Sequence, residues 1–241
     1  MDSVATIDIW ELPSGNGFGV SGVPATFTGP WRPNGALLLE AAIRLIDSGG
    51  ERAVKVEPLA ASLDMSVTMM YRYFGSRQGL VDAAQAERWV RSLSTSVSAS
   101  AQLLDDARSA TEFRKRFNQA VVAGLGRDRL GNLLRQANIV GSAYGRPELM
   151  TFVAATAKQV DQGLVTVIEG ARQRGWVLRN ADPVTITSWL TSVTFGRVLA
   201  WIEPDQAFDD DSWLTMTLEP LNQALFGKPA PRLATLKPVS A

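Results

Sequence analysis

Two short apolar repeats with helical spacing, joined by a tight polar turn, lie between residues 59 and 80. In the second repeat, Met70 and Phe74 are four residues apart and therefore share one face of a helix. Ser66 comes just before this helix, where its hydroxyl can accept a hydrogen bond from an early backbone amide. The segment predicts a helix-turn-helix whose second helix, residues 67–74, buries one face and leaves the other at the surface.

The end of this helix and the turn after it carry residues at a characteristic spacing. They are Tyr71-Arg72-Tyr73-Phe74, then Gly75, Ser76, Arg77 and Leu80. This spacing resembles the N-terminal domain of the TetR family of bacterial transcriptional regulators, over about residues 35–84. In that family a Tyr-x-x-Phe signature closes the recognition helix, and a turn, a Ser or Asn, a basic residue and a Leu lead into a long fourth helix. The resemblance implies a DNA-binding domain with a first helix over about residues 35–48.

The exposed side of the predicted recognition helix supplies the candidate DNA contacts. Arg72 is suited to guanine, and small or apolar groups beside it are suited to thymine methyl groups. Basic and neutral donors around the helix are candidates for phosphate contacts. The predicted DNA-binding residues are Lys55, Ser66, Val67, Thr68, Met69, Tyr71, Arg72, Tyr73 and Arg77. A buried helical hairpin would explain Met70 and Phe74 equally well, but not the exposed Arg72 and Tyr73.

The composition excludes several classes of functional site. The chain has no Cys and no His, which removes the usual zinc ligands, thiol nucleophiles and the commonest general base. It also lacks a Gly-Lys-Ser/Thr phosphate loop. We therefore expect a protein that is not an enzyme, without cofactor or metal. Because the formal net charge is zero, attraction to DNA must come from a local patch of the surface.

The pattern of apolar residues, Gly and Pro predicts an all-α chain of about nine helices. We expect a flexible N-terminal arm over residues 1–33, the helix-turn-helix domain over 34–80, a helical ligand-binding and dimerisation domain over 81–228, and a loose tail over 229–241. No secretory signal or membrane span is visible, so we expect a cytoplasmic protein.

Two apolar stripes near the C-terminus are candidates for a homodimer interface of the kind that the family resemblance implies. The predicted interface residues are Trp189, Val193, Gly196, Ala200, Leu214, Leu218, Leu221 and Leu225. Packing within one subunit explains such stripes too. The acidic run Asp209–Asp211 could bind a metal, but a helix N-terminus favours acidic residues without one.

Polar residues among the apolar faces of the predicted fifth to eighth helices, about residues 113–203, are weak candidates for an effector pocket, and the composition allows an apolar or aromatic small molecule. They are Asn118, Arg135, Asn138, Tyr144, Gln159 and Trp189. The sequence thus predicts a DNA-binding transcriptional regulator, a repressor released from a palindromic operator by a small-molecule effector. One alternative is a dimeric DNA-binding regulator without an effector, and another is an all-α ligand carrier or enzyme.

Overall fold

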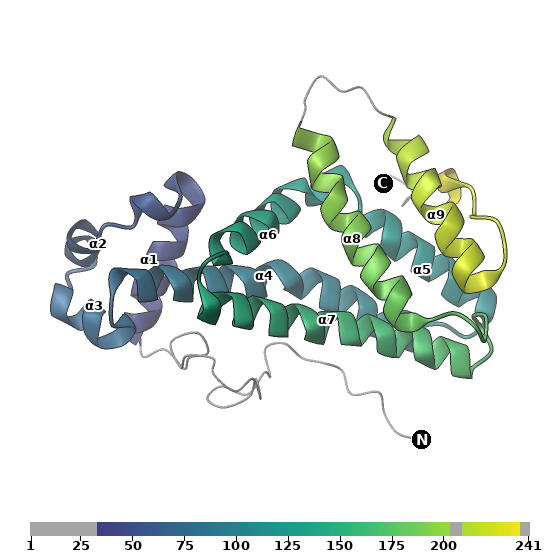
Figure 1. Ribbon diagram of the computed structural model, residues 1–241, viewed down its shortest axis with the longest axis horizontal. Coiled ribbons are helices and arrows are strands. Elements are labelled where there is room, and N and C mark those ends of the chain that lie inside the picture. Colours follow the sequence, from purple (N-terminus) through teal and green to yellow (C-terminus); the bar gives the residue numbers. More distant parts are fainter. Residues whose placement is uncertain (1–32, 203–208, 237–241) are drawn as a thin grey trace. The chain divides into compact units, whose positions relative to one another are not determined.

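The computed structural model describes residues 33–202 and 209–236, without the side chains of residues 94–102 and 202. All regular secondary structure in these ranges is helical, which confirms the predicted fold class. The elements are α1 (Pro33–Gly49), η2 (Glu51–Ala53), α2 (Val56–Ser62), α3 (Val67–Phe74), α4 (Arg77–Asp105), α5 (Ala110–Gly124), η3 (Arg127–Arg129), α6 (Leu130–Ala143), α7 (Pro147–Gln173), α8 (Pro183–Ile202), α9 (Asp210–Phe226) and η4 (Leu233–Thr235) (Figure 1). None of the helices in the described ranges has the length and apolar character needed to cross a membrane.

The chain divides into two compact units. In the described ranges, the N-terminal unit contains residues 33–92 and 138–156, and the C-terminal unit contains residues 93–137 and 157–236. The division falls inside α4, α6 and α7, so each of these helices contributes to both units. The boundary that the sequence predicts between the DNA-binding and the ligand-binding domains, after residue 80, lies inside the N-terminal unit. The predicted N-terminal arm lies, apart from Pro33, outside the described residues.

The N-terminal unit is built on α1, against which α2 and α3 pack (Figure 1). Leu38, Ala42 and Ile46 recur every four residues along α1 and are buried. Leu59 of α2 and Met70 of α3 are buried in the same unit. These few apolar side chains hold two short helices that would not be stable alone, because an isolated helix of seven or eight residues is marginal in water.

The turn between α3 and α4 depends on two glycines. Gly75 has a φ of 71°, in the left-handed region that favours glycine, and it ends α3. At Gly79 the backbone amide donates to the Ser76 hydroxyl oxygen at 2.9 Å, which caps the start of α4. A Cβ atom on Gly79 would lie 2.0 Å from the carbonyl oxygen of Phe74. Any side chain at residue 79 would therefore displace the turn that fixes α3 relative to α4.

Replacing Gly79 by alanine is expected to destabilise the protein by about 2 kcal/mol, because the new methyl group collides with rigid backbone. The melting temperature should fall by about 5 °C. Gly141→Ala is the matched control, since Gly141 lies in α6 with no atom within 4 Å of its ideal Cβ position. Alanine there should be neutral or slightly stabilising. Equal losses in the two variants, measured by thermal unfolding, would contradict the assigned role of Gly79.

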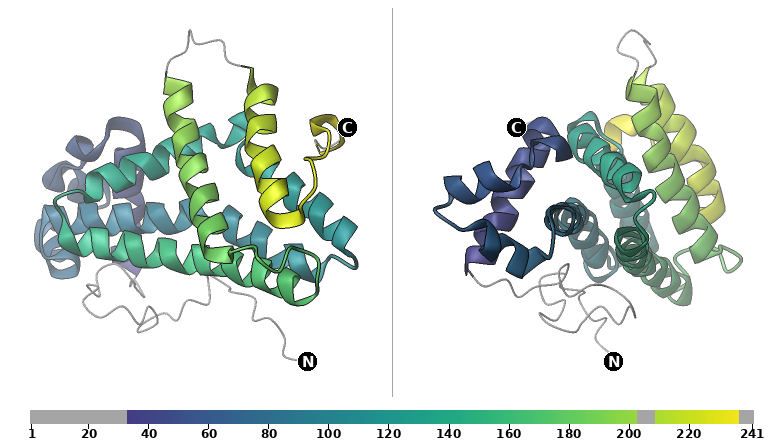
Figure 2. Two further views of the ribbon diagram at one scale, coloured as in Figure 1. Left: turned by 45° about the vertical axis from the view of Figure 1, so that its right-hand side comes forward. Right: turned by 60° about the vertical axis from the view of Figure 1, so that its left-hand side comes forward.

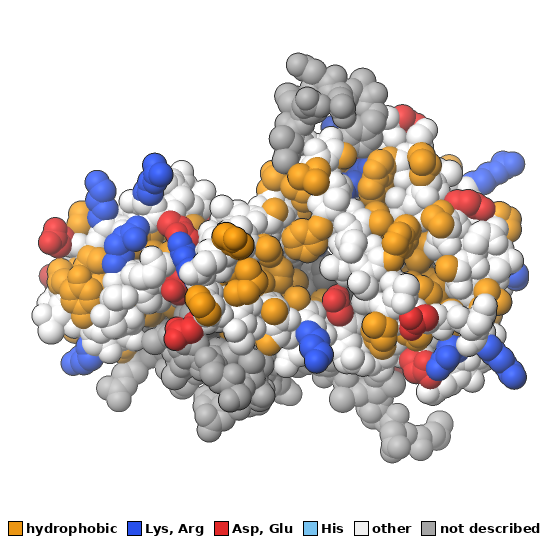
Figure 3. Space-filling model, viewed as in Figure 1, with side chains coloured by type: hydrophobic (Ala, Val, Ile, Leu, Met, Phe, Trp, Pro, Cys, Tyr) orange, Lys and Arg blue, Asp and Glu red, His pale blue; other side chains and the backbone are white. Residues whose placement is uncertain are grey.

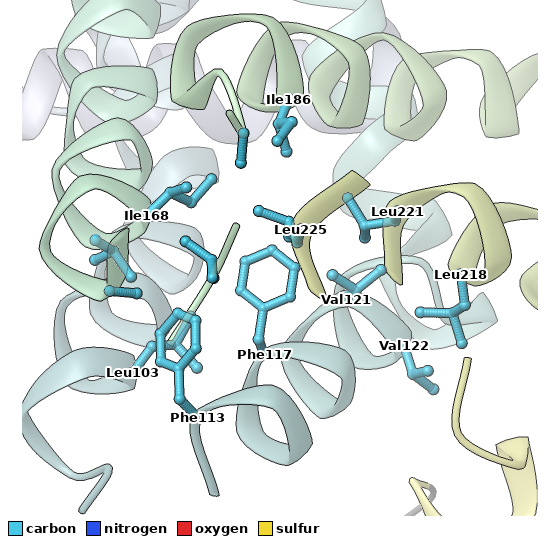
Figure 4. Packing of buried hydrophobic residues seen from close by; sticks show 14 of the residues in the cluster. Leu103, Phe113, Phe117, Val121, Val122, Ile168, Ile186, Leu218, Leu221 and Leu225 are labelled. Atoms are coloured by element: carbon cyan, nitrogen blue, oxygen red, sulfur yellow. The ribbon is translucent and has the colours of Figure 1, made fainter. Parts of the chain in front are cut away.

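The core of the C-terminal unit joins α5, α7, α8 and α9 (Figure 4). Phe113 and Phe117 of α5 lie at its centre with ring centroids 5.9 Å apart. Ile168 of α7 and Leu225 of α9 are fully buried in the same cluster. Helices α8 and α9 lie side by side in all views (Figures 1 and 2).

The C-terminal tail differs from its predicted loose state. After α9 the chain turns back, η4 forms, and Leu236 is 2% exposed within the core of the C-terminal unit. The backbone amide of Ala230 donates to the Glu219 carboxylate at 2.8 Å, which fixes the start of this segment. The segment is ordered despite its proline-rich composition, because Leu236 packs into the core of the C-terminal unit. Residues 237–241 lie outside the described ranges.

Candidate nucleic-acid interface

The recognition helix α3 is held by one face and capped at its start. The Ser66 hydroxyl oxygen accepts a hydrogen bond from the Met69 amide at 3.2 Å, as the sequence predicted. Met70 and Phe74 are buried, also as predicted. The helix therefore has a fixed orientation, with Thr68, Tyr71 and Arg72 exposed on its other side.

The outward side of α3 carries groups that can contact a DNA groove. Thr68, Tyr71 and Arg72 are exposed, and Val67 and Tyr73 are half-buried. The guanidinium carbon of Arg72 lies 5.6 Å from the centroid of the Tyr73 ring, a cation–π distance. No described carboxylate forms an ion pair with Arg72, so its donors are available to a ligand. Figure 3 shows further basic side chains over the N-terminal unit.

Three other predicted DNA contacts, Lys55, Ser66 and Met69, differ in their exposure and in the groups that they contact. Lys55 is exposed at the N-cap position of α2 and makes no side-chain cap bond. Ser66 is exposed, and its hydroxyl oxygen serves as the cap of α3. Met69 is half-buried, and its sulfur accepts a hydrogen bond from the Asn34 amide group of α1 at 3.4 Å. Met69 thus contacts α1 as well as lying on the recognition helix.

Arg77, predicted as a phosphate contact, has a structural role instead. Its Nε donates to the Val54 carbonyl oxygen at 2.7 Å, and its Nη2 donates to the Glu51 carbonyl oxygen. The side chain is half-buried and ties the start of α4 to the segment before α2. Because two of its donors point into the unit, the prediction that Arg77 holds a phosphate is corrected.

A network of charged side chains joins the helix-turn-helix to the corner between α6 and α7. Arg146, in this corner, forms ion pairs with Glu51 at 2.6 Å and with Asp82 of α4 at 3.1 Å. Gln85 of α4 donates hydrogen bonds to Glu51 at 2.7 Å and to the Ser142 hydroxyl at 3.1 Å. All of these residues belong to the N-terminal unit.

The electrostatics of Glu51 reflect this network. Burial by itself would raise the pKa of the Glu51 carboxyl, but hydrogen bonds from Arg146 and Gln85 outweigh burial and hold that pKa below its ordinary value. No sequence motif points to Glu51, Gln85 or Arg146. Glu51 and Arg146 are 95 residues apart, and neither lies in a motif that links them.

The leucines of α9 that were predicted for a subunit interface lie in the core of their own C-terminal unit. Each is at most 4% exposed. They are Leu214, Leu218, Leu221 and Leu225. Side chains that are buried within one chain have no surface to offer a second chain, so the prediction is corrected for these four. On the opposite face of α9, Met216 is 77% exposed.

The predicted interface face of α8 does reach the surface. Trp189 and Gly196 are exposed, and Val193 and Ala200 are half-buried. Leu199, next to this face, is 71% exposed. The assignment of this face to a subunit interface stays a prediction.

The weak candidates for an effector pocket lie in different surroundings, and two of them, Asn138 and Tyr144, belong to the N-terminal unit. Tyr144 is 87% exposed, and Asn138 is exposed and accepts a hydrogen bond from Arg88 at 3.4 Å. Asn118 is buried, but it exchanges two side-chain hydrogen bonds with Asn222 of α9 and so has partners already. The remaining candidates are exposed or half-buried: Arg135, Gln159 and Trp189.

The acidic run before α9 is explained by local structure. The Asp209 carboxylate accepts hydrogen bonds from the backbone amides of Asp211 and Ser212, which caps the helix. Asp210 forms ion pairs with Arg127 and Arg197. In the described ranges, no group of three acidic side chains is arranged to hold a metal ion.

Residues 38–84 match the family model for the bacterial regulatory proteins of the tetR family. The match runs from α1 through the capped recognition helix to the first turns of α4, which is the geometry described above. This part of the chain is a TetR-family N-terminal domain. Its helix-turn-helix is therefore the DNA-binding domain of a TetR-family transcriptional regulator. No curated protein sequence matches the chain significantly.

Solved structures share the TetR fold over most of their length. A TetR-family transcriptional regulator from Rhodococcus sp. is 19% identical with a TM-score of 0.55, covering 78% of this chain and 96% of that chain. A transcriptional regulator from Saccharomonospora viridis, solved with choline, is 17% identical with a TM-score of 0.55. The match covers 79% of this chain and 96% of that chain. The fatty acid degradation regulator FadR from Bacillus halodurans is 16% identical with a TM-score of 0.51. The match covers 81% of this chain and 95% of that chain. At these identities the likeness shows a shared fold.

Proposed function

We propose that this TetR-family chain is a homodimeric repressor that binds a palindromic operator and is released from it by a small-molecule effector. The observation that carries the DNA-binding part is the arrangement of α3. Met70 and Phe74 anchor one face, while Thr68, Tyr71 and Arg72 stand exposed on the other. A helix held in this way can enter the major groove with its side chains against base edges.

The second subunit follows from how such a helix reads DNA. One short recognition helix contacts too few base pairs for a specific site, and proteins of this kind read two half-sites through a twofold dimer. The candidate contact surface is the exposed face of α8 with Trp189, Gly196 and Leu199, joined by Met216 of α9. Exposed large apolar side chains of this kind are typical of protein–protein interfaces.

Effector response needs a physical link between a ligand and the recognition helix. The Arg146 network supplies one, because Arg146 holds both Glu51 before α2 and Asp82 of α4. Helices α6 and α7, which flank Arg146, continue into the C-terminal unit. A ligand that shifts α6 or α7 by a small amount would change these ion pairs, and a coupling of about 1 to 3 kcal/mol alters operator occupancy severalfold or more. The Saccharomonospora viridis regulator with choline supports the view that this fold accommodates small molecules.

The full-length protein and random DNA fragments from its own genome provide the test. We expect selection of bound fragments to yield one inverted repeat, and sedimentation on that repeat to show two chains per site. Thermal-shift screening of small molecules, followed by measurement of operator release, then tests the effector. A protein that stays a monomer on DNA, or that selects no sequence, would refute the proposal.

A further inference from the structure

Asp161 is a carboxylate partly removed from water, with no cationic partner among the described residues. It lies half-buried on α7, and the Thr191 hydroxyl of α8 donates a hydrogen bond to it at 3.1 Å. No described Lys or Arg lies within ion-pair distance of it. Burial raises the pKa of the Asp161 carboxyl above its ordinary value, and the Thr191 hydrogen bond opposes only part of this effect.

A buried polar group without a hydrogen-bond partner lies one helical turn before Thr191. Thr187 is on the same face of α8 as Thr191, is 2% exposed, and its hydroxyl oxygen has no hydrogen-bond partner. Elsewhere on α8, Ser192 and Thr194 donate to the carbonyl oxygen four residues earlier at 2.8 Å. Buried hydroxyl groups are nearly always hydrogen-bonded, so Thr187, four residues before Thr191 on α8, is an unsatisfied polar group of this helix.

The surroundings of this pair are mainly apolar. Leu164 and Val165 follow Asp161 by one turn on α7, and Leu190 precedes Thr191 on α8; all three are half-buried. Figure 3 shows hydrophobic side chains over α8. A few polar groups set in an apolar surface are the usual make-up of a small-molecule site.

We propose that Asp161, Thr191 and Thr187 bind the positively charged group of an organic cation, a protonated amine or quaternary ammonium on an apolar body. Such a cation compensates the carboxylate that the fold leaves uncompensated. An anion would be repelled, and a single carboxylate is too few ligands for a metal ion. The inference rests on the proposed function only in identifying this cation as the effector.

A matched series of probes tests the charge requirement. We expect hexylamine and hexyltrimethylammonium to bind the full-length protein and raise its melting temperature, while 1-hexanol and hexanoate bind at least 10-fold more weakly by titration calorimetry. The four probes share one apolar chain, so the difference reports the charged group. Comparable binding of hexanol or hexanoate, or no binding by any probe, would overturn the proposal.

The variant Asp161→Asn tests the residue, because asparagine has nearly the same volume and can still accept the Thr191 hydrogen bond. It should weaken binding of the cations at least 10-fold. Without ligand it should melt no lower than the parent protein, because the desolvated charge is gone. Glu169→Gln is the control, since it removes a half-buried carboxylate, paired with Arg172, from the same helix and should leave cation binding unchanged. Unchanged cation binding in Asp161→Asn, a lower melting temperature, or a changed oligomeric state would show a structural or interface role instead and would overturn the proposal.

Operator binding separates this inference from the proposed function. Cations that bind through Asp161 but do not release operator DNA would uphold the site and refute effector control. Operator release by another small molecule, unchanged in the variant Asp161→Asn, would uphold effector control and refute the cation site.

Discussion

Replacing Arg72 by alanine is expected to weaken binding to the selected operator about 10- to 100-fold at constant salt, the range for loss of one bidentate base contact. Arg72 is exposed on α3, forms no ion pair with a described carboxylate, and rests near the Tyr73 ring. Its removal leaves the anchored face of α3 intact, so the fold should be unaffected. Binding to unrelated DNA should fall far less, because the loss of one positive charge affects all sequences equally.

Arg179→Ala is the control for charge alone, since Arg179 is exposed in the C-terminal unit. It should leave the affinity ratio of operator to unrelated DNA unchanged. Fluorescence anisotropy with the selected repeat and a scrambled duplex measures both affinities. Equal losses on the two duplexes in Arg72→Ala would mean that Arg72 contacts phosphate and reads no base.

The recognition helix could be predicted from sequence because its signals are local. Met70 and Phe74 are four residues apart, and Ser66 caps the helix three residues before Met69. Helical periodicity and capping act within one or two turns, so they are visible without knowledge of the tertiary structure. The same holds for the ends of α8 and α9, which Pro183 and Gly227 mark.

The roles of Arg77 and of the α9 leucines could not be predicted, because they depend on residues far along the chain. Arg77 donates to carbonyl oxygens 23 and 26 residues earlier, and a basic residue at that position fits a phosphate contact equally well. A leucine stripe shows which face of α9 is apolar, but it does not say whether the cover comes from the same chain or from another. Here α5 of the same chain provides it. Polar pairs such as Asp161 with Thr191 cannot be predicted from sequence for the same reason, since the two residues are far apart along the chain.

Arg197 is the side chain whose loss should cost the C-terminal unit most stability. It is 1% exposed, and its guanidinium carbon lies 4.2 Å from the Trp213 ring centroid and 4.5 Å from that of Trp201. Its Nη2 donates to Asp210 at 2.7 Å, and its Nε donates to the Leu125 carbonyl oxygen at 3.2 Å. One buried cation thus connects α8, α9 and the end of α5.

Arg197→Ala should lower the free energy of unfolding by about 3 kcal/mol, at the low end for a broken buried pair because Asp210 keeps some contact with water. The melting temperature should fall by about 6 to 12 °C. The chain contains its own control, because Arg127 binds the other oxygen of Asp210 from the surface and is 65% exposed. Arg127→Ala should cost less than about 1 kcal/mol, as exposed ion pairs do. Chemical denaturation of both variants decides the matter: similar losses would show that attraction to Asp210, rather than burial between the two tryptophans, gives Arg197 its importance.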